Sequence, residues 1–314
     1  MTSNEARVHL VGRGIVGRRV HRLLHARRVV DADPRRLEIA NAMPGDVAIL
    51  AHACDHAAMA ARLLERGIHV VTVSDPLDDT RELLALGAVA TATATTLVIG
   101  AAFSPGLSEL IARHLANQLC TVDEIHVAVH GTAGPSCARI HHRSLSRRSI
   151  GWHDGEWVDY LGGSGRELCW FPEPIGAKDC YRARVPAPLL IHRSFPSVDR
   201  ISARRSARRR DRLTARLPML VRPPQEGGIG ALRVEVRGSD ATGGRQCLIA
   251  GVAELVGSAS AATASAFAAM TLDGRLPFGV VTAGDESLPT VELLRLVQSF
   301  GVRPQGFTGV PQPG

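Results

Sequence analysis

The chain has 314 residues, which is long enough for two domains with a sizeable core. Its hydrophobic fraction of 45% is that of a globular protein, and no apolar run approaches the roughly 18 residues that a bilayer-spanning helix needs. The net charge of +7 is carried almost entirely by arginine, with Lys178 as the only lysine, and such a surface attracts anionic nucleotides and carboxylates. The opening residues show no signal-peptide pattern, so we expect a cytoplasmic protein without membrane association.

The cysteine pattern indicates free thiols in a reducing compartment. No two cysteines form a C-x-x-C pair, and their spacing suits neither a zinc site nor a small disulfide scaffold, so we expect no metal. One of them acting as a catalytic nucleophile remains an alternative. The six are Cys54, Cys120, Cys137, Cys169, Cys180 and Cys247.

A glycine-rich turn follows the first predicted strand. Residues 7–11 form an apolar run that leads into Gly12-Arg13-Gly14-Ile15-Val16-Gly17, a helical pattern covers 18–26, and a second strand ends in Asp31-Ala32-Asp33. In a Gly-x-Gly-x-x-Gly turn the first glycine permits the tight turn and the third permits close packing of helix on strand. The second lets the backbone approach a pyrophosphate at the helix N-terminus. This order predicts a dinucleotide-binding site.

Strands and helices alternate through the first 120 residues. Further strands are predicted at 46–51, 69–73 and 96–99, with helices at 34–42, 55–66 and 78–86, and a helix capped by Ser104 runs to about 119. Nearly continuous apolar strands are typical of a parallel sheet covered on both faces. Ligands bind at the carboxyl ends of such strands. This edge carries the further candidate cofactor-binding residues Ala51, His52, Ala53, Ser74, Ala102 and Phe103.

The pattern changes after Cys120. Strands are predicted at 124–130, 168–171, 189–192, 231–237 and 246–252, which indicates a mostly antiparallel sheet. A small-residue helix at 258–270 is expected to pack on that sheet, and a helix at 291–300 to return to the first domain. We therefore expect an α/β protein with a dinucleotide-binding domain at 1–120 that helix 286–302 completes. An α+β domain for substrate binding and dimerisation follows at 121–285, and then a flexible tail at 303–314.

Three of these motifs together resemble a known family. They are similar to the saccharopine dehydrogenase-like oxidoreductases, and the likeness extends over residues 6 to about 116. The motifs that carry it are the turn at 12–17, the segment 67–71 before Ser74-Asp75, and the loop 100–106. The resemblance implies a Rossmann-type domain joined to an α+β domain, a homodimer, and NAD(P)-dependent hydride transfer on a C=N or C=O carbon of a small amino-acid-like or carboxylated metabolite. The short stretch from 33 to 46 also resembles homoserine dehydrogenases and sugar oxidoreductases, and Ala102 stands where many members have glycine, which leaves the substrate open.

Three residues are candidates for proton transfer or substrate contact. Asp75 follows the fourth strand near the expected nicotinamide, although it can equally serve as the N-cap of the next helix. His130 ends the first strand of the second domain, and histidine suits acid–base chemistry near neutral pH, with a hydrogen-bonded histidine as the alternative. Lys178 is a candidate because it is the one titratable amine side chain in an arginine-rich chain. The alternative is that this lysine is present by chance and has no functional role.

A basic cluster follows the first strand of the second domain. Arginine binds carboxylates through two parallel hydrogen bonds, so this cluster is a candidate clamp for a carboxylated substrate, and a solvated face is the alternative. Its members are Arg139, His141, His142 and Arg143.

The cofactor preference depends on the end of the second strand. Asp31 lies nineteen positions after Gly12, the spacing of a ribose-binding acid, which favours NAD. If Asp33 ends the strand instead, the nearby arginines bind the 2′-phosphate of NADP. The arginines are Arg13, Arg35 and Arg36, and we expect NADP in preference to NAD, with dual use open.

Two other functions remain open. The segment from Arg200 to Arg216 carries many arginines, and a nucleotide-sensing regulator could bind nucleic acid through it. It lacks interleaved aromatic residues and a helix-turn-helix pattern, so a solvated surface helix is the favoured interpretation and a nucleic-acid partner is not expected. The other alternative is a redox-inactive or non-redox relative that keeps the cofactor fold.

Overall fold

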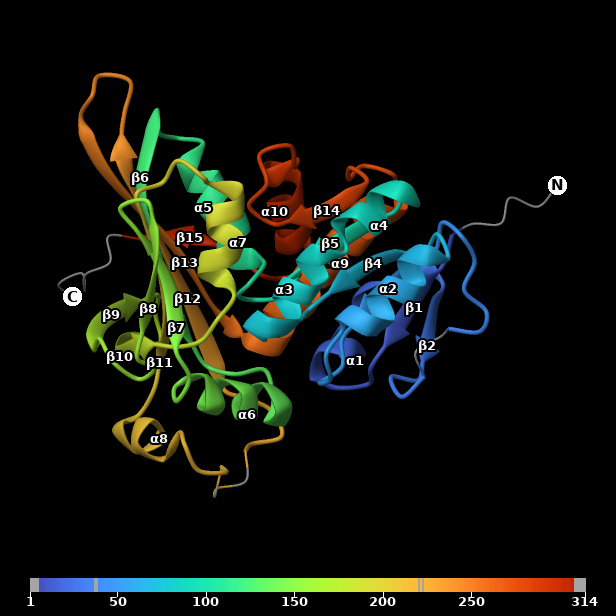
Figure 1. Ribbon diagram of the computed structural model, residues 1–314, viewed down its shortest axis with the longest axis horizontal. Helices are drawn as coiled ribbons and strands as arrows, with labels where there is room; N and C mark the ends of the chain where they lie inside the picture. The colour runs from blue at the N-terminus through green and yellow to red at the C-terminus, as the bar shows by residue number, and fades with distance from the viewer. Residues whose placement is uncertain (1–5, 37–38, 220, 222, 308–314) are drawn as a thin grey trace.

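The computed structural model describes residues 6–36, 39–219, 221 and 223–307. Two β-sheets organise the chain, one near each end of its long axis (Figure 1). The first sheet is parallel throughout and the second is mixed, mostly antiparallel, so the α/β fold class expected from the sequence is confirmed. Among the described residues no helix has the length and apolar character needed to cross a bilayer.

The parallel sheet has six strands in the order β14-β5-β4-β3-β1-β2. Its central strands are buried on both faces, as expected where helices cover both sides of a parallel sheet. Their bounds are β1 (Val8–Val11), β2 (Val29–Ala32), β3 (Val47–Leu50), β4 (His69–Thr72), β5 (Thr96–Ile99) and β14 (Gly279–Thr282).

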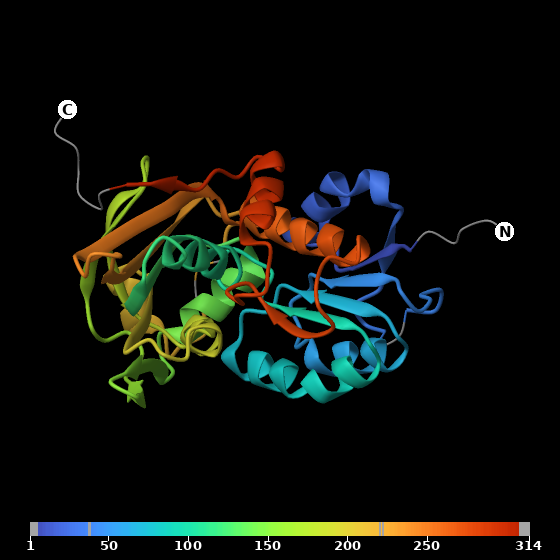
Figure 2. The ribbon, with the colours of Figure 1, turned by 90° about the horizontal axis from the view of Figure 1, so that it is seen from above.

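Helices lie on both faces of this sheet, with α1 and α9 on one side and α2, α3 and α4 on the other (Figure 2). Their bounds are α1 (Ile15–Leu23), η1 (His25–Arg27), α2 (Ala57–Glu65), α3 (Leu77–Ala85), α4 (Gly87–Ala92) and α9 (Val256–Leu272). The helix predicted at 258–270 is thus present as α9, but it packs against α1, α10, β3 and β4 as well as against the second sheet. Its alanine, glycine and serine residues permit this close approach on several sides.

The second sheet has nine strands, and its central path runs β15-β13-β12-β6-β11-β10-β9, with β7 pairing to β11 and β8. Strands β6 and β11 are parallel, and the other pairings are antiparallel. The bounds are β6 (Thr121–His130), β7 (Ser149–His153), β8 (Glu156–Tyr160), β9 (Glu167–Phe171), β10 (Gly176–Arg182), β11 (Arg200–Ser206), β12 (Ile229–Ser239), β13 (Arg245–Leu255) and β15 (Gln305–Gly306).

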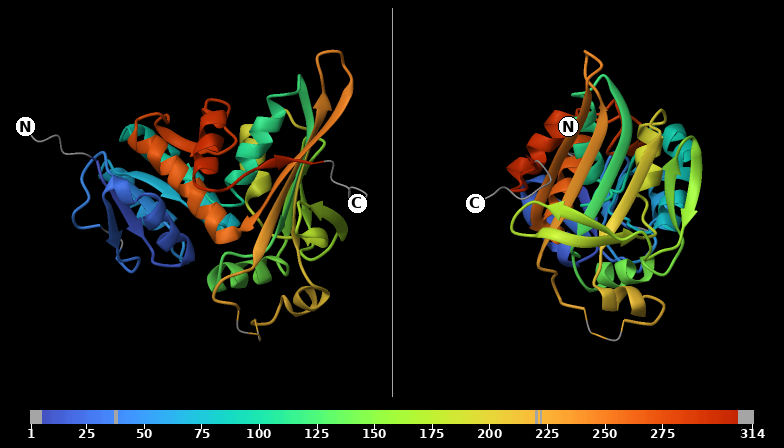
Figure 3. Two further views of the ribbon diagram at one scale, coloured as in Figure 1. Left: turned by 180° about the vertical axis from the view of Figure 1, so that it is seen from behind. Right: turned by 90° about the vertical axis from the view of Figure 1, so that its left-hand side faces the viewer.

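One face of the second sheet packs on helices, and the strands of its other face lie nearest to the viewer in the right-hand view of Figure 3. On β6, Ile125, Val127 and Val129 belong to the covered core, whereas the alternate residues Glu124 and His126 point to the open face. The remaining helices are α5 (Leu107–Ala116), α6 (Pro135–Ser144), α7 (Ala187–Ser194), α8 (Arg209–Thr214) and α10 (Thr290–Ser299).

Several sequence-based expectations about single elements were wrong. Residues 189–192 lie in helix α7 and not in a strand, since their apolar run is equally compatible with a buried helix. The described residues of 34–42 form turns and no helix. Helix α5 begins at Leu107 with Gly106 as its N-cap, because the Glu109 carboxylate accepts the backbone N–H of Gly106 at 2.5 Å. Ser104 therefore does not cap it.

The chain rejoins the parallel sheet earlier than the expected boundary at residue 285. Strand β14 adds to the edge of that sheet beside β5, and α10 packs on α9 and α5. In the expected tail, residues 305–306 pair with β13, while 308–314 lie outside the described residues.

Candidate cofactor and substrate pocket

The turn between β1 and α1 has the geometry that its glycines permit. Gly12 has φ of +116°, and a Cβ there would lie 2.5 Å from the carbonyl oxygen of Ala51. A Cβ on Gly17 would lie 1.9 Å from the carbonyl oxygen of Gly12, so helix and turn touch at this point. A Cβ on Gly14 would meet nothing within 4 Å. The turn is therefore closed at Gly12 and Gly17 and open beside Gly14, at the N-terminus of α1.

A cavity of about 400 Å³ opens beside this turn. Its walls are the carboxyl edge of the parallel sheet, helix α6, the start of α9 and one side chain from β11. Volumes of this order are usual for small-molecule sites, which combine apolar walls with a few polar groups.

Most of the residues expected to bind a cofactor line this cavity. They are Gly12, Arg13, Gly14, Ile15, Val16, Ala51, His52, Ala53, Ser74, Ala102 and Phe103. The expected residues that are not part of the lining are Gly17, Asp31, Asp33, Arg35 and Arg36.

Asp31, rather than Asp33, faces the glycine turn. The Asp31 carboxylate lies 3.2 Å from Nη2 of Arg13 and 3.3 Å from Nδ1 of His21. Asp33 instead accepts the backbone N–H of Arg35 at 3.0 Å within its own turn. An acid and an arginine are thus both present where the adenosine ribose of a dinucleotide is expected.

Four side chains from three distant segments meet at the far wall of the cavity. The Asp75 carboxylate accepts a hydrogen bond from Nε2 of His141 at 2.6 Å, and the Cys137 thiol lies 3.3 Å from the same nitrogen. Arg205 donates to Nδ1 of His141. Because a guanidinium has only donors, Nδ1 is the acceptor and Nε2 carries the proton that Asp75 receives.

The four groups also shift one another's titration. Burial alone would raise the pKa of Asp75, but the neighbouring His141 and Arg205 outweigh it and bring the pKa below its usual value. Burial and Arg205 lower the pKa of His141, yet Cys137 and Asp75 together raise it above the ordinary range. Burial would raise the pKa of the Cys137 thiol, but His141 lowers it overall. Such mutually perturbed groups in a cleft are typical of functional sites.

Each of these side chains reaches the cavity for a local reason. Asp75 lies in the short loop between β4, which ends at Thr72, and α3. The N-cap of α3 is Pro76 and has no side-chain cap, so the N-cap alternative for Asp75 is not what the structure shows. Cys137 and His141 are one helical turn apart on α6 and share a face. Arg205 lies on the covered face of β11, where neighbouring positions alternate between faces.

The donor set of this cluster resembles a metal site but does not fit one. Ligand atoms of Asp75, Cys137 and His141 lie within 4.8 Å of one another. A metal-bound histidine normally donates its other ring N–H to an acceptor, whereas here Nδ1 faces the cationic donor Arg205. The guanidinium would also repel a metal ion, so we assign no metal to this cluster.

His52 lies near the other end of the same cavity. Burial and the adjacent His56, whose ring centroid is 4.3 Å away, lower the pKa of His52 to about 4. The imidazole is therefore neutral near pH 7 and adds no charge to the cavity.

His130 and Lys178 lie near each other but not in this cavity. The neighbouring Val129 lines the cavity, whereas His130 points to the open face, where Nδ1 lies 2.6 Å from the Ser206 hydroxyl. Burial lowers the pKa of His130, and Lys178 lowers it further. Alternation along β6 separates these two residues from the cluster at Asp75.

Only one member of the predicted basic clamp reaches the cavity. His141 lines it, whereas His142 is buried against the Thr214 hydroxyl at 3.2 Å, and Arg139 and Arg143 are exposed. Helical periodicity distributes these neighbours over different faces of α6.

Cys137 and Arg205 also line the cavity, and neither was predicted to bind cofactor or substrate. The spacing of Cys137 and His141, four positions apart in a helix, is a signal that could have paired them. The segment from 200 to 216 is not one surface helix, since 200–206 is strand β11 and only 209–214 is helical. Its arginines therefore point to different surfaces and do not form a single basic face.

Comparisons with known proteins agree with this fold. No protein-family model and no curated protein matches the chain. Saccharopine dehydrogenase (L-Glu forming) from Saccharomyces cerevisiae is similar in structure, with a TM-score of 0.66 at 12% identity, covering 96% of this chain and 100% of that chain. The DAP dehydrogenase of C. glutamicum in complex with DAP has a TM-score of 0.50 at 18% identity, covering 92% of this chain and 95% of that chain. The two-domain dehydrogenase fold that the resemblance implied is confirmed.

Proposed function

We propose that this protein is an NAD(P)-dependent oxidoreductase that transfers a hydride to or from a C=N or C=O carbon of a small amino-acid-like or carboxylated metabolite. The observation that supports it most is that the open side of the glycine turn and the Asp75–His141–Arg205 cluster line one cavity. A dinucleotide on the turn would extend along the strand ends toward that cluster.

The chain offers a place for each part of the cofactor. Gly12 to Gly17 would hold the pyrophosphate at the N-terminus of α1, beside the space left open at Gly14. Exposed Arg35 and Arg36, together with Arg13, would bind a 2′-phosphate, and Arg13 also neutralises the carboxylate of Asp31. We therefore propose NADP(H) as the preferred cofactor. When bound, its nicotinamide supplies or accepts the hydride.

The cluster would bind the substrate and handle the proton. The buried guanidinium of Arg205 suits a substrate carboxylate, which it can bind through two parallel hydrogen bonds. When a hydride adds to the carbon of a C=N or C=O group, the nitrogen or oxygen must take up one proton. Once Arg205 turns to the substrate carboxylate, Nδ1 of His141 no longer faces a donor and can take up a proton, which the raised pKa favours. With Nε2 held by Asp75, His141 would donate the Nδ1 proton, and in the reverse direction Nδ1 would accept it.

Self-association belongs to the same proposal. The resemblance implies a homodimer formed through the second domain, and the mass of the purified protein in solution measures it directly.

The experiment that tests this function is a titration of the full chain with NADPH and NADH, followed by the emission of the reduced nicotinamide. We expect saturable binding, tighter for NADPH, and then turnover with a panel of keto acids, amino acids and ammonia. Tighter binding of NADH would reverse the cofactor preference. Binding without turnover on any substrate would favour the redox-inactive relative, and no binding of either nucleotide would refute the proposal.

A further inference from the structure

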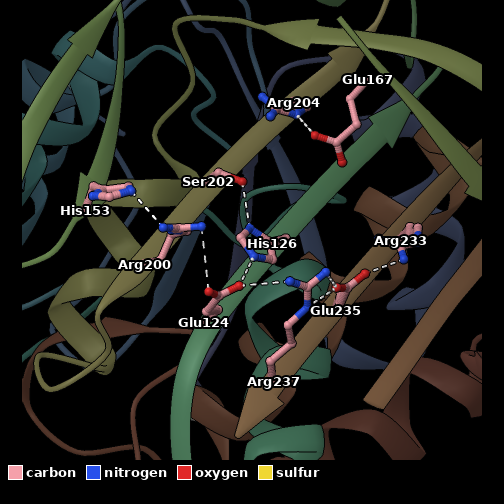
Figure 4. Close-up of polar contacts among 10 residues, drawn as sticks. All are labelled: Glu124, His126, His153, Glu167, Arg200, Ser202, Arg204, Arg233, Glu235 and Arg237. Atoms are coloured by element: carbon pink, nitrogen blue, oxygen red, sulfur yellow. Dashed lines mark hydrogen bonds and ion pairs between the residues drawn. The ribbon is translucent and has the colours of Figure 1, made fainter. Parts of the chain in front are cut away.

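A second cavity, of about 550 Å³, lies on the open face of the second sheet. The sheet itself separates this cavity from the cofactor pocket, because successive side chains along β11 point to opposite faces of the sheet. Arg205 lines the cofactor pocket, whereas its neighbour Arg204 lines this second cavity. Figure 4 shows most of its charged side chains, which come from β6, β11 and β12 and from the adjoining strands β7 and β9. Arg182 of β10, which is not drawn there, also lines the cavity.

One row of residues across this cavity pairs two arginines with a glutamate between them. On the sheet, Glu124 of β6 stands between Arg200 of β11 and Arg237 of β12. The Glu124 carboxylate lies 3.7 Å from Arg200 and 3.1 Å from Arg237, so each arginine has an acid (Figure 4).

Four residues further along β6, the equivalent central position carries no acid. Ala128 stands between Arg204 of β11 and Arg233 of β12, and Arg182 of β10 pairs with Arg204 in the same row. This row therefore brings three arginines together around an alanine, about 13 Å along the strand from Glu124.

The acids near this row neutralise it only in part. Arg204 donates to Glu167 at 2.6 Å, and Arg233 donates to Glu235. Arg182 stacks on the Tyr160 ring at 3.8 Å and has no ion pair with any residue that the structure describes. Over the whole lining, five arginines face three glutamates.

The row also holds unsatisfied donors. Nη1 of Arg204 and Nε of Arg233 are buried and have no acceptor within the described part of the chain. A buried donor without a partner is unfavourable, and the oxygens of a bound anion or of water would satisfy it.

We infer that this cavity binds a small organic anion carrying carboxylate or phosphate groups, which the arginines of this row, Arg182, Arg204 and Arg233, hold from the cavity wall. Guanidinium forks match both kinds of oxyanion. Trp152, Tyr160 and Trp170 add flat apolar walls for the carbon part of the ligand. The site is distinct from the proposed cofactor pocket and does not depend on its function.

Tryptophan emission of the full chain provides a local reporter for this site. Trp152 and Trp170 line the cavity, Trp157 packs on Trp152 with ring centroids 5.2 Å apart, and none of the three lines the cofactor pocket. The probes are citrate and pyrophosphate, each titrated at constant ionic strength. We expect a saturable change with at least one of them, and which probe binds distinguishes a carboxylate ligand from a phosphate ligand.

Arg182→Gln is the decisive variant. Because Arg182 has no ion pair with a described residue, replacing it leaves no carboxylate of the described chain without its partner. Loss of one hydrogen bond to a charged group weakens binding by about tenfold or more. Arg166→Gln is the matched control, since this exposed arginine pairs with Asp179 outside the cavity. Gly14→Ala, which changes only the cofactor pocket, is expected to leave binding of the probe unaltered.

Three results would overturn the inference: no saturable response to either probe, equal affinity in Arg182→Gln and wild type, or a loss of binding in Gly14→Ala. If Arg182→Gln does not fold, as judged by circular dichroism, Arg204→Gln replaces it. Sedimentation of the same variants measures self-association. A change in assembly mass without binding of any probe would show that the face is a contact between copies and not a ligand site.

Discussion

Nε2 of His141 donates a hydrogen bond to the Asp75 carboxylate at 2.6 Å, although 66 residues separate the two in the chain. The contact joins the carboxyl edge of the parallel sheet to helix α6 beside the second sheet. It therefore couples a proton-carrying group to the wall of the cavity where the nicotinamide is expected.

Replacing this acid should change both rate and pH dependence. Asp75 raises the pKa of His141, so Asp75→Asn lowers that pKa. If protonated His141 donates in the reductive direction, the rate falls as pH rises through its pKa, and in the variant this fall moves to lower pH. We expect kcat to drop by about 10²- to 10⁴-fold, with nucleotide binding retained. The control is Asp78→Asn, an exposed acid at the start of α3. An unchanged pH profile in Asp75→Asn would refute this role.

The glycine turn can be tested by two substitutions with opposite outcomes. Gly17→Ala places a methyl group 1.9 Å from a backbone oxygen, so we expect a loss of about 2–4 kcal/mol in the free energy of unfolding. Gly14→Ala meets no atom within 4 Å, so stability should change by less than about 1 kcal/mol. It should still weaken nucleotide binding, because the methyl group occupies the space expected for the pyrophosphate. Urea unfolding and a cofactor titration separate the two effects. Unchanged nucleotide affinity in Gly14→Ala would place the dinucleotide elsewhere.

His52 should make the protein less stable in acid. Its pKa of about 4 in the folded state lies below its ordinary value of 6.5, so the unfolded chain takes up this proton first. The contribution of the neutral His52 imidazole to the free energy of unfolding is complete above pH 6.5 and is lost progressively as the pH falls to 4. Allowing for partial exposure, the loss is about 1 kcal/mol.

Urea unfolding at pH 7.5 and pH 4.5 measures this loss. His52→Asn should reduce the difference between the two pH values, while His114→Asn, at an exposed position, should leave it as in wild type. The same difference in all three proteins would exclude His52 as the cause.

Arg113 holds three segments together. It donates to the carbonyl oxygens of Ser194 and Gly284, each at 2.8 Å, and its guanidinium lies 3.9 Å from the Phe195 ring centroid. Arg113→Met should therefore lower the free energy of unfolding by about 2–4 kcal/mol, since two carbonyl groups lose their donor. Arg193→Met at an exposed position is the control. A change of less than about 0.5 kcal/mol in Arg113→Met would show that water replaces the lost donors.

The local pattern of the sequence was sufficient for the glycine turn and for five of the six strands of the parallel sheet, while β14 at its edge was not predicted. Apolar runs, turn residues and the spacing of Gly12, Gly14 and Gly17 act within about thirty residues, and each has a conformational or steric meaning of its own. Four strands of the second sheet, β6, β9, β12 and β13, were predictable for the same reason, whereas the other five, β7, β8, β10, β11 and β15, were not predicted. The short apolar run at 189–192 was not, because it fits a buried strand or a buried helix equally well, and packing against β7, β11 and α5 decides between them.

The candidate site depended on the tertiary structure. The sequence marked Asp75 and His141 separately, but their contact requires the second domain to place α6 at the edge of the parallel sheet. Arg205 and Arg204 look alike in the sequence, and only the pairing of β11 with β6 decides which of them enters the cofactor pocket. Strand alternation likewise directs His130 away from it. Backbone conformation and core periodicity are encoded by neighbours in the chain, whereas the face that a polar side chain occupies is decided by strand pairing and by the packing of segments distant in sequence.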